Sequence, residues 1–138
     1  MLTTIQLGEH HCFFTQSQFS LSWQHSVEKQ PWLERYERRE HDFLLLDTQF
    51  KAFGAGTPDQ GQLLPAPAGY VRFAVQQPLS QISWVVSHNV QSTLWLDTLP
   101  LALYQWGADY DAAEFQVQKW PWWKTLLKDS CDDYALGH

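Results

Sequence analysis

The chain has 138 residues, of which 44% are hydrophobic and 15% aromatic, enough apolar material for the packed core of one domain. Nine basic residues against fifteen acidic ones give a formal net charge of −6, which excludes a basic surface for a nucleic-acid backbone. No run approaches the ~18 apolar residues of a membrane-spanning helix. We therefore expect neither a nucleic-acid partner nor a transmembrane segment.

Alternation of apolar and polar residues predicts short strands along most of the chain. It is clearest from Phe19 to His25, where Phe19, Leu21 and Trp23 share one face. The other predicted strands cover residues 2–7, 11–14, 32–38, 43–53, 70–75, 82–88 and 92–96. Short strands at this spacing are typical of an all-β fold, either an antiparallel sandwich or a small barrel.

The C-terminal part follows a different pattern. Alternation fades from Gln105 onward, so we divide the chain into a β domain over residues 1–104 and an extension over 105–138. The pattern of Trp and Leu residues predicts a helix over 121–132 that packs its apolar face on the β domain. Contact of the tryptophans with a membrane is the alternative, and Asp129, Asp132 and Asp133 oppose it because they repel anionic lipid.

Cysteine content and the first residues bear on the cellular compartment. Cys12 and Cys131 could pair, but two free buried thiols are the simpler expectation. The sequence runs from Met1 directly into a strand pattern without a basic and apolar leader, which favours a cytoplasmic protein. A periplasmic location is the alternative if a leader has been removed.

Two short motifs bring together polar and glycine-rich residues. The first is His-Ser-Val-Glu-Lys at 25–29, and the second is Gly-Ala-Gly-Thr-Pro at 54–58. If the three strands around them run up, down and up, both motifs lie at the same end of one sheet. A tight connection would place His25 opposite Trp32, with Glu34 on the diagonal, where an imidazole and a carboxylate can form a polar pair.

Each catalytic interpretation of these motifs has a weakness. Ser26 is adjacent to His25, so their side chains point to opposite faces of a strand, and no nucleophile elbow is present. A metal site from His25, Glu28, Glu34 and His88 lacks the usual ligand spacing. The glycines at 54 and 56 are not followed by the lysine of a phosphate-binding loop. We expect no metal and no cofactor.

The order of these motifs resembles the bacterial family described as domain of unknown function 1850. The resemblance covers about residues 5–99 and rests on His-Ser-Val-Glu-Lys, Glu34-Arg35-Tyr36 and Gly-Ala-Gly. Members are often encoded beside TAXI-type TRAP transporter components, which implies a link to solute uptake.

The resemblance and the motifs together predict a non-enzymatic accessory or binding protein. Its partner would be a TAXI-type TRAP transporter component or a small solute. The alternative is a small enzyme that uses His25 and Glu34 as acid and base in a pocket at the same end of the sheet. The predicted binding residues are His25, Ser26, Glu28, Lys29, Glu34, Gly54, Ala55 and Gly56.

Overall fold

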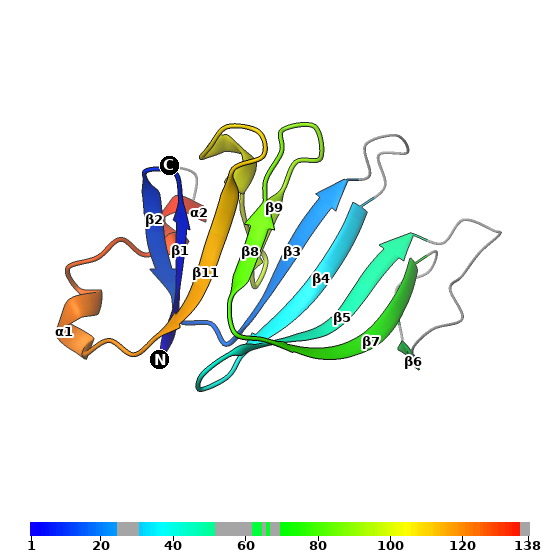
Figure 1. The fold of residues 1–138 in the computed structure, drawn as a ribbon, viewed down its shortest axis with the longest axis horizontal. Helices are drawn as coiled ribbons and strands as arrows, with labels where there is room; N and C mark the ends of the chain where they lie inside the picture. Colours follow the sequence, from blue (N-terminus) through cyan, green and yellow to red (C-terminus); the bar gives the residue numbers. More distant parts are fainter. Residues whose placement is uncertain (25–30, 52–61, 65, 67–69, 136–138) are drawn as a thin grey trace.

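A computed structural model of the protein describes residues 1–24, 31–51, 62–64, 66 and 70–135. Within these residues the strands form two antiparallel sheets that pack face to face (Figure 1). The larger sheet is open at both edges rather than closed on itself. The predicted all-β fold is therefore confirmed, as a sandwich and not as a barrel.

The smaller sheet has the strand order β2-β1-β11-β8 in the described part of the chain. Its strands are β1 (Leu2–Leu7), β2 (His10–Phe14), β8 (Ile82–Val85) and β11 (Ala112–Gln118). The sequence pattern did not lead us to expect β11, although Ala113 and Phe115 alternate with polar residues and are fully buried. This strand lies between β1 and β8, so residues beyond 105 contribute to the centre of the smaller sheet.

The larger sheet has the strand order β10-β9-β3-β4-β5-β7-β6, again counting the described residues. Its strands are β3 (Gln18–Gln24), β4 (Pro31–Arg38), β5 (Phe43–Lys51), β6 (Gln62–Leu64), β7 (Tyr70–Leu79), β9 (Thr93–Leu96) and β10 (Leu99–Leu101). A short 3-10 helix, Leu103–Gln105, follows β10. The chain crosses between the two sheets after β2, β7, β8 and β10, and the crossing from β7 into β8 is a tight turn (Figure 1).

Aromatic side chains join the two sheets. Phe19 on β3 stacks on Phe115 on β11, with ring centroids 5.7 Å apart, and Phe14 meets Phe19 edge to face. Burial of a side chain of this size contributes about 1.5–3 kcal/mol to folding. The inward-facing residues of the cleanest alternating segment therefore form the centre of the core, as the sequence predicts.

The tail corrects the expected helix over 121–132. Two short helices are present instead, α1 (Trp122–Thr125) and α2 (Cys131–Ala135). The predicted apolar face does not pack on the sheets, because Trp122, Trp123, Leu126 and Leu127 are all exposed. The nearby outer face of the smaller sheet carries mostly polar residues such as Gln6 and Gln116, so it offers little apolar surface for these side chains.

The two cysteines form a disulfide, which corrects the expectation of free thiols. Cys12 on β2 is bonded to Cys131 at the start of α2, with their Cα atoms 5.0 Å apart. Next to the bond, the Phe13 N–H donates to the Asp129 carbonyl. Helix α2 contacts both β2 and β10, the edge strands of the two sheets. The disulfide therefore fixes the tail across one edge of the sandwich.

Candidate functional site

The strands that lead into the two motifs end side by side. Gln24 at the end of β3 pairs with Pro31 at the start of β4. Strands β4 and β5 are antiparallel neighbours, and Lys51 at the end of β5 pairs with Tyr70 at the start of β7. These four strand termini lie at one end of the larger sheet, which we term the motif end (Figure 1).

The motif residues themselves lie outside the described part of the chain. This applies to seven of the predicted binding residues, namely His25, Ser26, Glu28, Lys29, Gly54, Ala55 and Gly56. The two motifs connect to strands that terminate at the motif end. Their contact with one another stays a prediction.

Glu34 is the one predicted binding residue within the described part. It lies on the core-facing side of β4, as predicted, together with Trp32 and Tyr36. The Tyr36 hydroxyl donates a hydrogen bond of 2.5 Å to the Glu34 carboxylate. Burial, followed by the charge of Glu34, raises the pKa of Tyr36 far above its ordinary value. Tyr36 therefore stays protonated and acts as a fixed donor to Glu34.

The expected pairing of His25 with Trp32 is wrong. Trp32 lies opposite Trp23, and the two indoles stack with centroids 6.1 Å apart. Glu34 lies opposite Leu21, so its diagonal neighbours on β3 are Phe19 and Trp23. Alternation predicts which face a residue occupies, but the length of the connection between β3 and β4 sets the register. That connection is longer than a tight turn.

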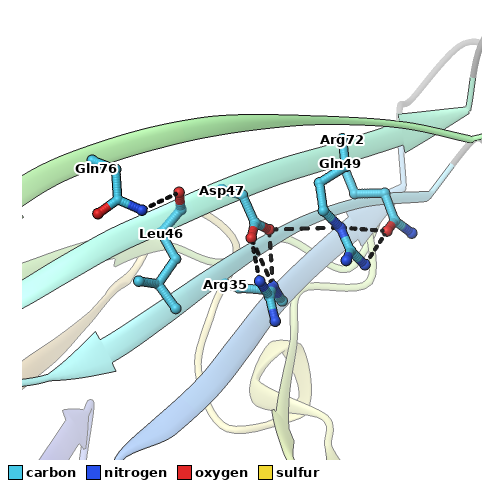
Figure 2. A network of polar contacts seen from close by, with 6 residues as sticks. All are labelled: Arg35, Leu46, Asp47, Gln49, Arg72 and Gln76. Atoms are coloured by element: carbon cyan, nitrogen blue, oxygen red, sulfur yellow. Dashed lines mark hydrogen bonds and ion pairs between the residues drawn. The ribbon is translucent and has the colours of Figure 1, made fainter. Parts of the chain in front are cut away.

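The opposite face of the larger sheet holds a charged cluster that we did not predict (Figure 2). Asp47 on β5 is 1% exposed and lies between Arg35 on β4 and Arg72 on β7. Arg35 Nε lies 2.9 Å from both carboxylate oxygens, and its Nη2 also donates to Oδ2. Arg72 Nε lies 3.8 Å from Oδ1, while its Nη2 donates to Gln49 Oε1 at 2.6 Å. One carboxylate thus faces two guanidinium groups.

Irregular pairing in β5 explains why Asp47 faces outward. Regular alternation from Phe43 and Leu45 would direct Asp47 into the core. The register shifts next to Leu46, so that Arg35 pairs with Asp47 while the next residue of β4 pairs with Leu45. This bulge moves Asp47 to the outer face and leaves Phe43 and Leu45 on the core side. The carboxylate therefore reaches two arginines instead of the apolar interior.

A groove of about 510 Å³ crosses this outer face near the motif end. Trp95 on β9 forms part of one side, where its Nε1 donates to Ser22 Oγ at 2.8 Å. The lining residues are Ser20, Ser22, Trp32, Leu33, Gln49, Tyr70, Trp95 and Asp97. A groove of this volume is large enough for a small organic molecule, which would contact both apolar rings and polar groups.

The groove continues toward the arginine cluster. A smaller hollow of about 160 Å³ shares Ser20, Trp95 and Asp97 with it and is also lined by Arg35. Gln49 provides a second connection, since it lines the groove and accepts hydrogen bonds from Arg72. A ligand in the groove would therefore lie close to guanidinium groups that Asp47 holds in place.

Other candidate sites are less developed. A second hollow, of about 430 Å³, lies between the smaller sheet and the tail, and its lining mixes Glu114 and Asp129 with Lys124 and Lys128. Across the described ranges, no group of three or more His, Cys, Asp or Glu side chains could hold a metal ion. His88, considered for a metal site, instead has Nδ1 2.8 Å from an Asp109 carboxylate oxygen.

The sequence contained one signal for the arginine cluster. Asp47 interrupts the run Phe-Leu-Leu-Leu-Asp-Thr-Gln-Phe at 43–50, where alternation would bury it. A carboxylate in such a strand needs a cationic partner, because an unpaired buried charge is very costly. Arg35 and Arg72 could not be chosen from among the arginines without the strand register.

The described helices are all too short to cross a membrane.

Comparison with known proteins identifies a family and no characterised relative. No curated protein and no solved structure shows significant similarity to the chain. The family model described as Domain of unknown function (DUF1850) matches residues 19–101, which include the groove and the arginine cluster. This match covers more than half of the sequence, and the chain belongs to that family.

Proposed function

We propose that the protein is a non-enzymatic binding or accessory protein of a TAXI-type TRAP solute uptake system. Its recognition surface would lie at the motif end of the larger sheet. The observation that carries this proposal is the groove of about 510 Å³, which opens near the motif end and lies within the family-matched region. A concave surface of this size favours a small solute over a flat protein contact.

The charge distribution favours an organic anion as the solute. Asp47 neutralises one of the two guanidinium groups that face it, which leaves one positive charge in the cluster. Asp97 lines both the groove and the smaller hollow beside Arg35, so it would repel an anionic group that does not lie against the guanidinium groups of Arg35 or Arg72. We therefore infer a ligand whose carboxylate points toward Arg35 and whose apolar part lies against Trp95.

The groove lining supports binding rather than catalysis. Among the described lining residues of the two hollows, the ionisable side chains on the outer face are Arg35, Asp97 and Tyr70, whereas the hydroxyl of Tyr36 donates to Glu34 on the core side. An arginine stays protonated at all ordinary pH values and does not transfer protons, and Asp97 has no second carboxylate and no histidine beside it among the described lining residues to complete an acid–base pair. The enzymatic alternative requires Glu34, which faces the core side of the sheet, where Tyr36 donates to it.

The disulfide favours the periplasm as the location. Disulfides persist in oxidising compartments and are rare in the bacterial cytoplasm. The Cys12–Cys131 bond is buried, with exposed fractions of 4% and 0% for the two residues. A periplasmic protein could meet a solute before it crosses the inner membrane.

Blocking the groove tests the proposal. Ser20 lines both hollows, so Ser20→Tyr should fill them without disturbing the core. The matched control is Ser83→Tyr, at an exposed position on the outer face of the smaller sheet. Hexanoate, hexanamide and hexylamine serve as probes that share one carbon skeleton and differ in charge.

We expect calorimetry to show that hexanoate binds more tightly than hexanamide, and hexylamine least. Ser20→Tyr should abolish hexanoate binding and reduce transporter-dependent growth, whereas Ser83→Tyr should change neither. Equal binding of the three probes would contradict an anion site. Equal growth of the two variants would contradict a role for the groove in uptake.

A further inference from the structure

The tail carries an exposed apolar patch outside the family-matched region. Trp122, Trp123, Leu126 and Leu127 are 76%, 53%, 74% and 74% exposed. They lie on α1 and the turn that follows it, at the far left of Figure 1, away from the two sheets. Large apolar side chains that cluster on a surface mark an interaction site, whereas isolated ones do not.

Lysines surround this patch. Lys119 and Lys128 are exposed at the two ends of the segment, and Lys124 lies in its middle with Nζ 4.6 Å from the centre of the Trp120 ring. No acidic residue occurs between Lys119 and Lys128, although the whole chain has a formal net charge of −6. The apolar patch is thus also the most basic segment of an acidic protein.

The segment is fastened at both ends. Before it, Gln118 at the end of β11 pairs with Leu2. After it, Phe13 N–H donates to the Asp129 carbonyl, and the adjacent Cys131 forms the disulfide. The sandwich therefore presents Lys119–Lys128 as an anchored loop, which reduces the entropy lost when the loop binds a surface.

Of the acidic residues that follow, Asp132 belongs to a different surface, whereas Asp129 lines the same hollow as Lys124 and Lys128. Asp132 accepts a hydrogen bond from Gln16 Nε2 at 3.0 Å. It lies on α2, which packs on the edge strands β2 and β10. Asp132 is therefore directed toward the protein body, whereas Asp129 and Asp133 are exposed, and the three lysines of the loop outnumber those two carboxylates.

We propose that Lys119–Lys128 is a membrane-docking loop that binds an anionic lipid surface. Tryptophan favours the boundary between lipid headgroups and acyl chains, where leucine side chains can insert. Lysines at both ends of the loop would contact anionic headgroups. A protein partner fits less well, because the centres of protein interfaces are depleted in lysine.

Vesicle co-sedimentation of the oxidised, full-length chain tests this proposal. The probes are phosphatidylcholine vesicles with and without phosphatidylglycerol. One variant carries Trp122→Ser with Leu126→Ser, and another carries Lys119→Gln, Lys124→Gln and Lys128→Gln. The control is Val85→Ser, which removes a 54% exposed apolar side chain from the smaller sheet. Denaturant unfolding of each variant verifies that the fold is retained.

The wild-type protein should bind vesicles that contain phosphatidylglycerol more tightly than vesicles of phosphatidylcholine alone, and added salt should weaken the binding. The three lysine substitutions should weaken it about a hundredfold, at roughly fivefold for each lysine. The Trp122/Leu126 variant should lose binding, and Val85→Ser should not. The proposal is overturned if the wild-type protein binds neither kind of vesicle or binds both kinds equally. It is also overturned if the protein self-associates and Trp122→Ser abolishes that self-association.

Discussion

Removal of the Asp47 charge should destabilise the protein more than removal of an exposed carboxylate. In Asp47→Asn, the amide oxygen can still accept from Arg35, but the amide N–H groups would face guanidinium donors. Loss of one partner from a buried ion pair costs about 3–5 kcal/mol. The Arg35 side chain is 37% exposed, and water would solvate it in part, so we expect about 2–3 kcal/mol.

Denaturant unfolding and calorimetry measure this effect. At about 4 °C per kcal/mol for a chain of this size, the melting temperature should fall by roughly 10 °C. The control is Asp42→Asn, which removes the carboxylate of the surface pair with Arg39 and should leave the melting temperature almost unchanged. The double variant Arg35→Met/Asp47→Leu should recover most of the lost stability, because the guanidinium left behind, that of Arg72, is partly exposed and still donates to Gln49.

Two outcomes would refute this reasoning. If Asp47→Asn and Asp42→Asn lowered the melting temperature equally, Asp47 would not be a buried, paired charge. If the double variant were as unstable as Asp47→Asn, the cost would come from lost packing or from Arg72 rather than from an uncompensated Arg35 guanidinium group. Either result would also remove the structural basis for a positioned Arg35 in the hollow next to the groove.

The remaining predictions concern the disulfide, the buried tyrosine and the tail. Cys131→Ser, which removes the bond to Cys12 across 119 residues, should lower the free energy of unfolding by about 2–4 kcal/mol. A reductant should destabilise the wild-type protein by the same amount and leave the variant unchanged. The raised pKa of Tyr36 favours the folded state below the ordinary value of 10.0, and this contribution is lost as the pH rises above it. The stability of Tyr36→Phe should therefore fall less steeply above that pH than the stability of the wild type, in unfolding curves measured across the alkaline range. Trp122→Ser should leave the melting temperature unchanged, because the side chain is 76% exposed, and a large decrease would mean that it packs on the fold.

Side-chain alternation predicted most of the described strands and their buried faces, but not β6, β10 or β11. Phe19 and Leu21 lie in the core as expected, and Glu34 shares a face with Tyr36. Alternation has no information about pairing register, which is why Trp23 and not His25 lies opposite Trp32. The predicted fold was therefore more accurate than the predicted contacts of its side chains.

The features that were missed depend on irregular pairing or on distance along the chain. The bulge next to Leu46 reverses the phase of β5 and directs Asp47 to the outer face, and no residue type at that position required a bulge. Cys12 and Cys131 are 119 residues apart, and their proximity follows from the position of α2 against two edge strands. The groove combines residues of β3, β4, β5, β7 and β9, so it became visible only with the order of the sheet.

The most direct test of solute binding in the groove is the indole N–H signal of Trp95 in a two-dimensional ¹H–¹⁵N NMR spectrum. This group donates to Ser22 at the side of the groove, and Trp95→Phe assigns its signal. On addition of hexanoate, the Trp95 signal should shift in a saturable manner, with a smaller shift for hexylamine, while the signal of the exposed Trp122 stays in place. A Trp95 signal that does not move, or that moves no more than that of Trp122, would contradict the assignment of the groove as a binding site.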